Sequence, residues 1–162
     1  MKNRPPAATL KKVIVLLQDR TRLRGYLNPA QLRAEEKFNL LTPDGTHAPV
    51  ALPDVRSVYF VREFGENFEP ERKAFQSRPK LEGLWVRLKF RDNGDTIEGL
   101  LPNNLLELLD RGVYLTPPGL SGLTTRIFIP RAAIEELTVL GVIGIARRKP
   151  ATTPRQTRLF EE

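Results

Sequence analysis

Short apolar stretches separated by turn residues dominate the pattern of this chain, and one of them alternates strictly. Between residues 84 and 91 every second residue is apolar, and the residues between them are Trp85, Arg87, Lys89 and Arg91. This period of two predicts a strand with one buried face and one basic face. Similar apolar runs predict further strands at residues 13–17, 23–27, 38–42, 49–52, 55–61, 112–116, 126–130 and 137–145.

The helices that the pattern allows are short. Asn28-Pro29 is typical of a helix start, because Asn caps a helix and Pro costs nothing at its first position. We expect one helix over residues 30–37 and a second over 105–111, capped by Asn104. The sequence Asp92-Asn93-Gly94-Asp95 predicts a tight hairpin turn after the alternating strand.

The chain also contains an internal repeat. The 21 residues from Gly25 align without a gap with those from Gly99, and seven positions are identical. Each copy follows an apolar strand and precedes another that passes through a proline. Repeats of this kind determine architecture, so we expect two similar units of small size.

Five short strands and a small helix per unit predict an all-β fold of two tandem five-stranded barrels, since closure removes exposed strand edges. We expect a disordered arm at residues 1–10, a first barrel at 11–64, a linker at 65–80, a second barrel at 81–146 and a basic flexible tail at 147–162.

Charge is concentrated at the two ends of the chain. The formal net charge is +7, of which residues 1–24 contribute +6 and residues 147–162 contribute +3, so the body between them carries −2. The tail supplies Arg147, Arg148 and Lys149, which could bind phosphates without reading sequence, or could serve only solubility. A body close to neutral weakens the case for nucleic-acid binding from net charge alone.

Catalytic and metal sites are not indicated. The chain has no cysteine and a single histidine, His47, with no partner at a spacing that supports acid–base chemistry. Residues 92–95 carry oxygen ligands but lack the length and closing glutamate of a calcium loop. We therefore expect no enzyme activity, metal or cofactor. Without a membrane span or an apolar leader, we expect a cytoplasmic protein with no membrane contact.

The order of these signals resembles the Sm-like fold, a bent five-stranded barrel of SH3 type. Residues 13–27 and 84–101 look like its first half, and residues 50–61 and 126–140 look like its second. In that family an apolar-Asn step contributes to an RNA base pocket, which the resemblance places at Phe38 and Asn39 in the first copy only. The second copy lacks the asparagine, and the Arg-Gly pair of the family is absent from both.

Residues 84–144 also look like a bacterial domain of unknown function that occurs alone or attached to signalling proteins. This resemblance implies an adaptor or regulatory role. For Trp85 two interpretations stay open: base stacking on the basic face beside Arg87, Lys89 and Arg91, or filling of the junction between the two barrels.

Two functions are consistent with these observations. The one we favour is a non-enzymatic bacterial adaptor that binds a protein partner in regulation. The alternative is an Sm-like RNA-binding protein that uses its basic ends and the Phe38/Asn39 pocket. Edge-to-edge joining of three chains would give a trimeric ring of six barrels, as a further hypothesis on oligomeric state.

Overall fold

The computed structural model describes residues 9–65, 73–108, 110–119 and 122–144, and these residues form a mostly β structure with two short helices. The predicted basic residues Arg147, Arg148 and Lys149 lie outside the described residues. So does most of the predicted N-terminal arm.

The elements follow the same order in each half of the chain. The first half contains β1 (Lys11–Leu17), β2 (Arg22–Leu27), α1 (Ala30–Ala34), β3 (Lys37–Leu41), β4 (His47–Ala51), the 3-10 turn η2 (Leu52–Asp54) and β5 (Val55–Val61). The second half contains β6 (Gly83–Phe90), β7 (Thr96–Leu101), α2 (Leu105–Leu108), β8 (Gly112–Leu115), β9 (Thr124–Pro130), the 3-10 turn η3 (Arg131–Ala133) and β10 (Ile134–Ile143).

Helix starts and turns follow the local chemistry expected of them. The Asn28 side chain accepts a hydrogen bond from the Ala30 amide at 3.1 Å, and Asn104 accepts one from Leu106 at 3.1 Å. Both helices are shorter than predicted. After α1 the chain returns at once to extended conformation, with φ −132° at residue 35. Asp92 to Asp95 form the hairpin turn between β6 and β7.

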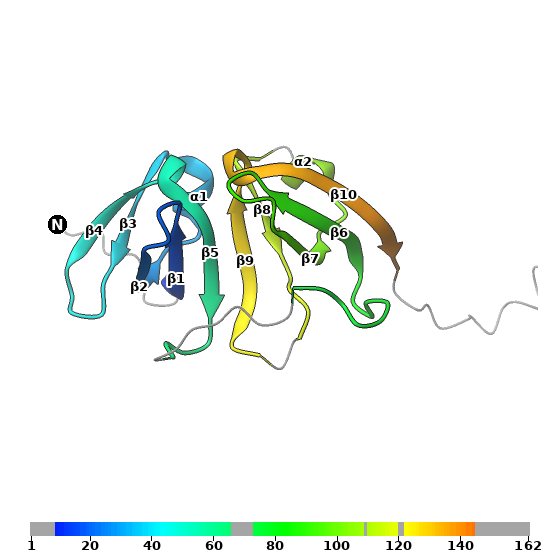
Figure 1. Cartoon of the computed structure of the whole chain (residues 1–162). Helices are drawn as coiled ribbons and strands as arrows, with labels where there is room; N and C mark the ends of the chain where they lie inside the picture. The colour runs from blue at the N-terminus through cyan, green and yellow to red at the C-terminus, as the bar shows by residue number, and fades with distance from the viewer. Residues whose placement is uncertain (1–8, 66–72, 109, 120–121, 145–162) are drawn as a thin grey trace, which may run out of the picture.

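The strands form two antiparallel sheets (Figure 1). A seven-stranded sheet has the order β4-β3-β2-β1-β5-β9-β8, and a three-stranded sheet has the order β10-β6-β7. A single bridge joins them, with Leu100 of β7 and Thr116 after β8 exchanging hydrogen bonds of 2.9 and 2.8 Å. The described strands therefore form one continuous succession that begins at β4 and ends at β10.

Two separate closed barrels were expected, and the described strands instead form open sheets. The physical reason lies in β5, which pairs with β1 on one side and with β9 on the other. Val58 is opposite Phe128 and Tyr59 is opposite Ile127 in this pairing. Because β5 and β9 saturate each other's edges, neither can close a barrel within its own half.

Apolar side chains form two cores on opposite faces of the central strands. Val13 and Val15 of β1 enter the first core, whereas Ile14 between them enters the second. In β5 Val58 faces the first core and Tyr59 the second. Successive residues of a strand point to opposite faces, so a strand with both faces covered is buried along its whole length, as all seven residues of β5 are.

Gly25 and Gly99 mark equivalent close approaches in the two halves. A side chain at Gly25 would lie 2.7 Å from Leu40 Cγ, and one at Gly99 would collide with the side chain of Leu115. Leu40 and Leu115 thus occupy equivalent positions in the two halves. The ungapped sequence alignment pairs Leu41 with Leu115, so it is displaced by one residue in this region.

Candidate functional site

The open edge of β10 is a feature of the fold that a second molecule could use. Strand β10 is the longest, with ten residues, and within the described part of the chain it pairs only with β6. No strand of the described residues pairs with its other edge, which carries backbone donors and acceptors. Such an edge is a template for pairing with another chain unless the protein protects it.

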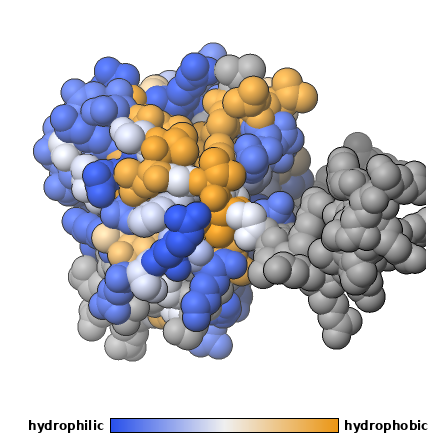
Figure 2. Space-filling view, turned by 90° about the vertical axis from the view of Figure 1, so that its right-hand side faces the viewer, coloured by the Kyte–Doolittle hydropathy of each residue, from blue (hydrophilic) through white to orange (hydrophobic). Residues whose placement is uncertain are grey.

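Charged side chains of β10 itself lie at its start and not at its end. Glu135 and Glu136 place negative charge near the first residues, but residues 137–144 contain no charged side chain. Val139 and Val142 are 53% and 58% exposed. Figure 2 views this side of the molecule and shows apolar residues gathered on it. An edge that is both open and apolar is typical of a binding surface.

The opposite end of the succession, β4, is protected differently. Pro49 lies at its centre, opposite Asn39 of β3. A proline is tolerated in an edge strand where its nitrogen faces away from the sheet, since it has no hydrogen to donate. We infer that the outer edge of β4 lacks a donor at this position. Of the two open edges, β10 is therefore the better able to accept a strand.

A packed layer supports β6, the strand that holds β10. Trp85 Nε1 donates to Glu98 Oε1 at 3.0 Å, and the Phe75 ring meets Trp85 edge-on with centroids 6.3 Å apart. Glu98 is 8% exposed and also accepts hydrogen bonds from the Phe75 amide and Arg87, both at 3.4 Å. These partners lie in β6, in β7 and in the segment before β6, so Trp85 does not fill the junction between the halves, and its indole is engaged in the fold.

The basic residues predicted beside Trp85 are likewise engaged. Lys89 pairs with Glu135 of β10 at 3.3 Å, and Arg91 donates to the carbonyl oxygens of Ala132 and Ile134 at 3.2 and 2.9 Å. These contacts join β10 and its preceding turn to β6, and the Arg87–Glu98 pair joins β6 to β7 on its other side. The alternating basic face is therefore a set of local contacts that position the edge strand.

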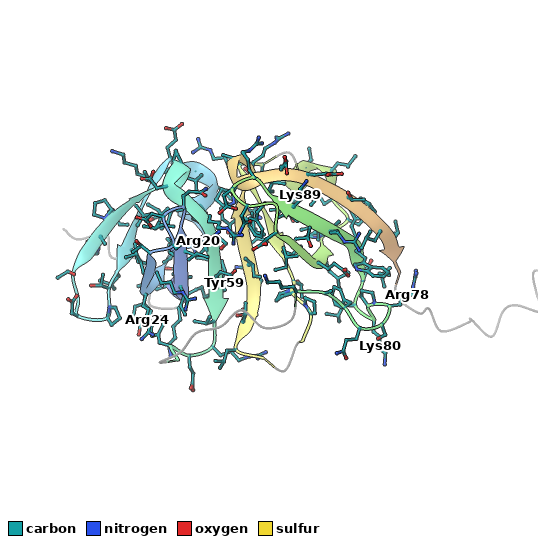
Figure 3. All side chains as sticks on the ribbon, in the orientation of Figure 1. Arg20, Arg24, Tyr59, Arg78, Lys80 and Lys89 are labelled. Carbon is teal, nitrogen blue, oxygen red and sulfur yellow. The ribbon has the colours of Figure 1, made fainter. Side chains whose placement is uncertain are left out.

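Arg78 reaches β10 from the segment before β6. Its guanidinium donates to the Val142 carbonyl at 3.3 Å, and Figure 3 shows Arg78 and Lys80 beside the end of this strand. These side chains place positive charge next to the apolar part of the edge. A bound segment with acidic residues flanking an apolar centre would be complementary to it.

Phe38 and Asn39 do not form a pocket together. Phe38 is 1% exposed in the first core, where it packs with residues such as Val50 and Val58. Asn39 points the other way and is exposed, and its backbone amide donates to Gln31 Oε1 at 3.1 Å. The alternation of β3 separates the two side chains, so the Phe38 ring is covered by the fold and does not face a base.

Neither an acid–base pair nor a metal cluster is found in the described parts of the chain. His47 is exposed at the start of β4. No group of three or more His, Cys, Asp and Glu side chains among the described residues could hold a metal ion. Within those same residues, every helix falls short of the length and apolarity needed to cross a membrane.

The open edge was not identified from the sequence. The apolar run from residue 137 to 145 predicts a strand, but its amino acids do not indicate which strands lie beside it. The absence of charge after Glu136 was the one available signal. Together with the exposure of Val139, it becomes informative once the neighbours of β10 are known.

Comparison with known proteins gives one match. A model of a family of unknown function, DUF6982, matches residues 9–141, which include every described strand apart from the last two residues of β10. No curated protein and no solved structure matches the chain.

Proposed function

The chain belongs to the family of unknown function DUF6982, and we propose that it is a non-enzymatic protein-binding module that takes up an extended segment along the open edge of β10. The observation that carries this proposal is the uncharged, open second half of β10, with Val139 and Val142 more than half exposed. Strand addition of this kind obtains affinity from backbone hydrogen bonds and specificity from alternate side chains.

The rigidity of the edge supports the proposal. Lys89–Glu135 and the contacts of Arg91 hold β10 in place before any partner arrives. A preorganised edge loses little conformational entropy on binding, which favours affinity at a small interface. The role of β6 and its packed layer is then to present β10.

The proposed occupant is a segment of another protein, with an apolar centre and acidic flanks. The β4 strand of a second copy could pair with β10, as β9 pairs with β5 within the molecule. However, Phe128 at the centre of β9 pairs with Val58, whereas Pro49 stands at the centre of β4 and lacks a donor. A trimeric ring of six units is therefore less well supported than a partner protein.

We further propose that the two halves are a tandem repeat of small units similar to the Sm-like type, joined through β5 and β9. The recurrence of the element order and the matching places of Gly25 and Gly99 support this relationship. Together with the likeness to a bacterial regulatory domain, a repeat with no acid–base pair among its described residues is consistent with an adaptor in bacterial regulation. The RNA-binding alternative has less support, because Phe38 is a core residue.

The test is selection of peptides from a displayed random library on the full chain, followed by affinity measurement with the selected peptides. We expect recovery of extended sequences with an apolar centre. Val139→Lys and Val142→Lys should weaken their binding by about tenfold or more, because each places a desolvated charge at the contact. Leu106→Lys is the matched control, since Leu106 is 78% exposed on α2, outside β10.

The outcomes separate the alternatives. Equal loss of peptide binding in Leu106→Lys and Val142→Lys would contradict an edge-specific site. Recovery of no peptide, together with tight binding of labelled single-stranded RNA, would favour the RNA-binding alternative.

A further inference from the structure

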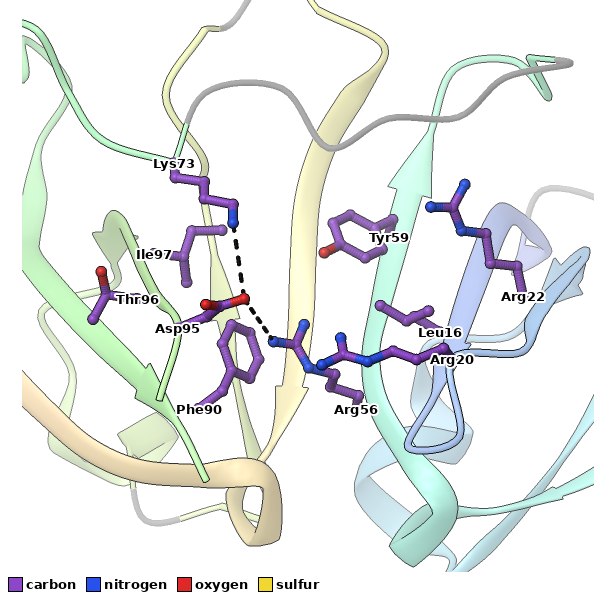
Figure 4. Close-up of a pocket in the computed structure, with 10 residues that line it drawn as sticks. All are labelled: Leu16, Arg20, Arg22, Arg56, Tyr59, Lys73, Phe90, Asp95, Thr96 and Ile97. Carbon is purple, nitrogen blue, oxygen red and sulfur yellow. Dashed lines mark ion pairs between the residues drawn. The ribbon is translucent and has the colours of Figure 1, made fainter. Parts of the chain in front are cut away.

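A second site, independent of β10, lies where the two halves meet. We call it the junction pocket, a hollow of about 190 Å³ (Figure 4). Four cationic side chains line it, namely Arg20, Arg22 and Arg56 from the first half and Lys73 from the segment before β6. Opposite charge is supplied by Asp95 in the lining and by Asp92 beside it. Four positive charges against two negative charges leave an excess that favours an anion.

Arg56 is the fixed centre of this group. It lies in the core strand β5, and its charged side chain is only 6% exposed. Its Nε lies 3.0 Å from Asp92 Oδ2. Its guanidinium stacks 3.7 Å from the centroid of the Phe90 ring. A buried cation is costly unless it is paired and hydrogen-bonded. These contacts hold the guanidinium at the wall of the hollow.

Arg20 is brought to the same place by an unusual backbone. Within the described chain it is the only residue other than glycine with positive φ, at 74°, which costs an L residue about 1–2 kcal/mol. Its Nη2 lies 3.2 Å from Asp92 Oδ2. Strain of this kind is retained where the surrounding structure enforces it, often at a ligand site.

Of the two carboxylates, Asp95 leaves the nearby donors of Arg56 and Lys73 available to a ligand. Asp95 Oδ2 lies 3.9 Å from Lys73 Nζ and 4.0 Å from Arg56 Nη2. These separations exceed a hydrogen bond, so Asp95 offsets charge without occupying either donor. Lys73 is 65% exposed at the side chain and can turn toward a bound molecule.

We propose that the junction pocket binds a small phosphate-bearing anion. Arg56 forms the rigid contact, and Arg22 and Lys73 close on the anion from the two halves. Guanidinium groups match the geometry of phosphate oxygens and make charge-assisted hydrogen bonds to them. The volume is below the roughly 300 Å³ of sites for drug-sized ligands, so the anion is small. Leu16, Phe90 and Ile97 give one wall an apolar character suited to an organic group.

The test is a titration of the full chain with inorganic phosphate, followed by amide chemical shifts, with ionic strength held constant by chloride. We expect saturable shifts around the junction pocket. Arg22→Gln and Lys73→Gln should each weaken binding by about tenfold, the loss expected for one charge-assisted contact. Both residues are exposed, so these changes should leave the fold intact.

Arg24→Gln is the matched control, because it removes the same charge two residues along β2 and Arg24 does not line the pocket. A parallel titration with the small monophosphate ester glycerol 3-phosphate distinguishes a free anion from the phosphate of an organic molecule. Tighter binding of the monophosphate would identify an organic phosphate, and equal binding would identify phosphate itself. Failure to saturate by about 10 mM, or equal weakening by Arg24→Gln, would overturn the proposal.

Discussion

The rings of Phe128 and Tyr114 pack against each other with centroids 5.0 Å apart and planes inclined at 56°. Both residues come from the second half of the chain, yet both pack in the first core. Phe60 of β5 completes the cluster, 5.9 Å from Tyr114. The second half thus supplies part of the interior of the first, and the β5–β9 pairing is a packed junction as well as a hydrogen-bonded one.

Truncation at this junction should destabilise the whole molecule. Phe128 is 1% exposed, so we expect Phe128→Ala to lower the free energy of unfolding by about 3–5 kcal/mol through the cavity it leaves. Phe64→Ala, at a partly buried ring that packs against the second core, is the control and should cost less. Chemical denaturation measures both. A Phe128→Ala cost no larger than the Phe64→Ala cost would argue against a shared core.

The close approach at Gly99 predicts an overpacked variant. A methyl group there would collide with the Leu115 side chain, so we expect Gly99→Ala to destabilise the protein by about 1–3 kcal/mol. A side chain at Gly144 would meet no atom within 4 Å. Gly144→Ala should therefore fall within about 0.5 kcal/mol of the parent. Equal effects of the two substitutions in thermal unfolding would contradict this packing.

Tyr114 should make stability fall at alkaline pH. Burial raises the pKa of its phenol above the ordinary value of 10.0, against the opposing charges of Arg126 and Arg33. The folded state holds the phenol proton more tightly than the unfolded state does. The contribution of Tyr114 to the free energy of unfolding is therefore complete below pH 10.0. It is lost as the pH rises through the raised pKa.

The free energy of unfolding, measured between about pH 9 and pH 11, should therefore fall less with rising pH in Tyr114→Phe than in the parent. Tyr26→Phe, at a ring that packs edge-on against Phe64, should retain the loss. An unchanged alkaline slope in Tyr114→Phe would exclude Tyr114 as its source.

Pro49 predicts the oligomeric state. If its missing donor keeps β4 from accepting β10 of a second copy, light scattering should give the mass of one chain at micromolar concentration. Pro49→Val would restore the donor and should increase self-association. A trimeric mass for the parent chain would instead support the ring of six units.

Much of the strand layout could be predicted from the sequence, because β6 and the apolar runs of β1 and β5 follow simple patterns. The partners of β5 could not. Its seven buried residues indicate two covered faces, but pairing with β9 is a long-range relationship that no local pattern encodes. Arg56 was the one available signal that β5 contacts another part of the chain. A cation inside an apolar strand requires a fixed carboxylate, which Asp92 supplies from the turn after β6.

For the candidate residues, too, the strand could be predicted from the sequence and the side-chain partners could not. Trp85 and the basic residues near it were correctly placed on one strand, but their partners Glu98 and Glu135 belong to neighbouring strands. The alternation Phe38-Asn39-Leu40 already predicts that Phe38 and Asn39 face opposite ways. The family resemblance had set the two residues together in one pocket.

The most direct test of the account is amide hydrogen exchange on the full chain with and without a selected peptide. Strand addition predicts new protection at alternate amides of residues 137–143, with β4 unchanged. Protection confined to β4, or none within β10, would contradict the proposal that the open edge of β10 is the binding site.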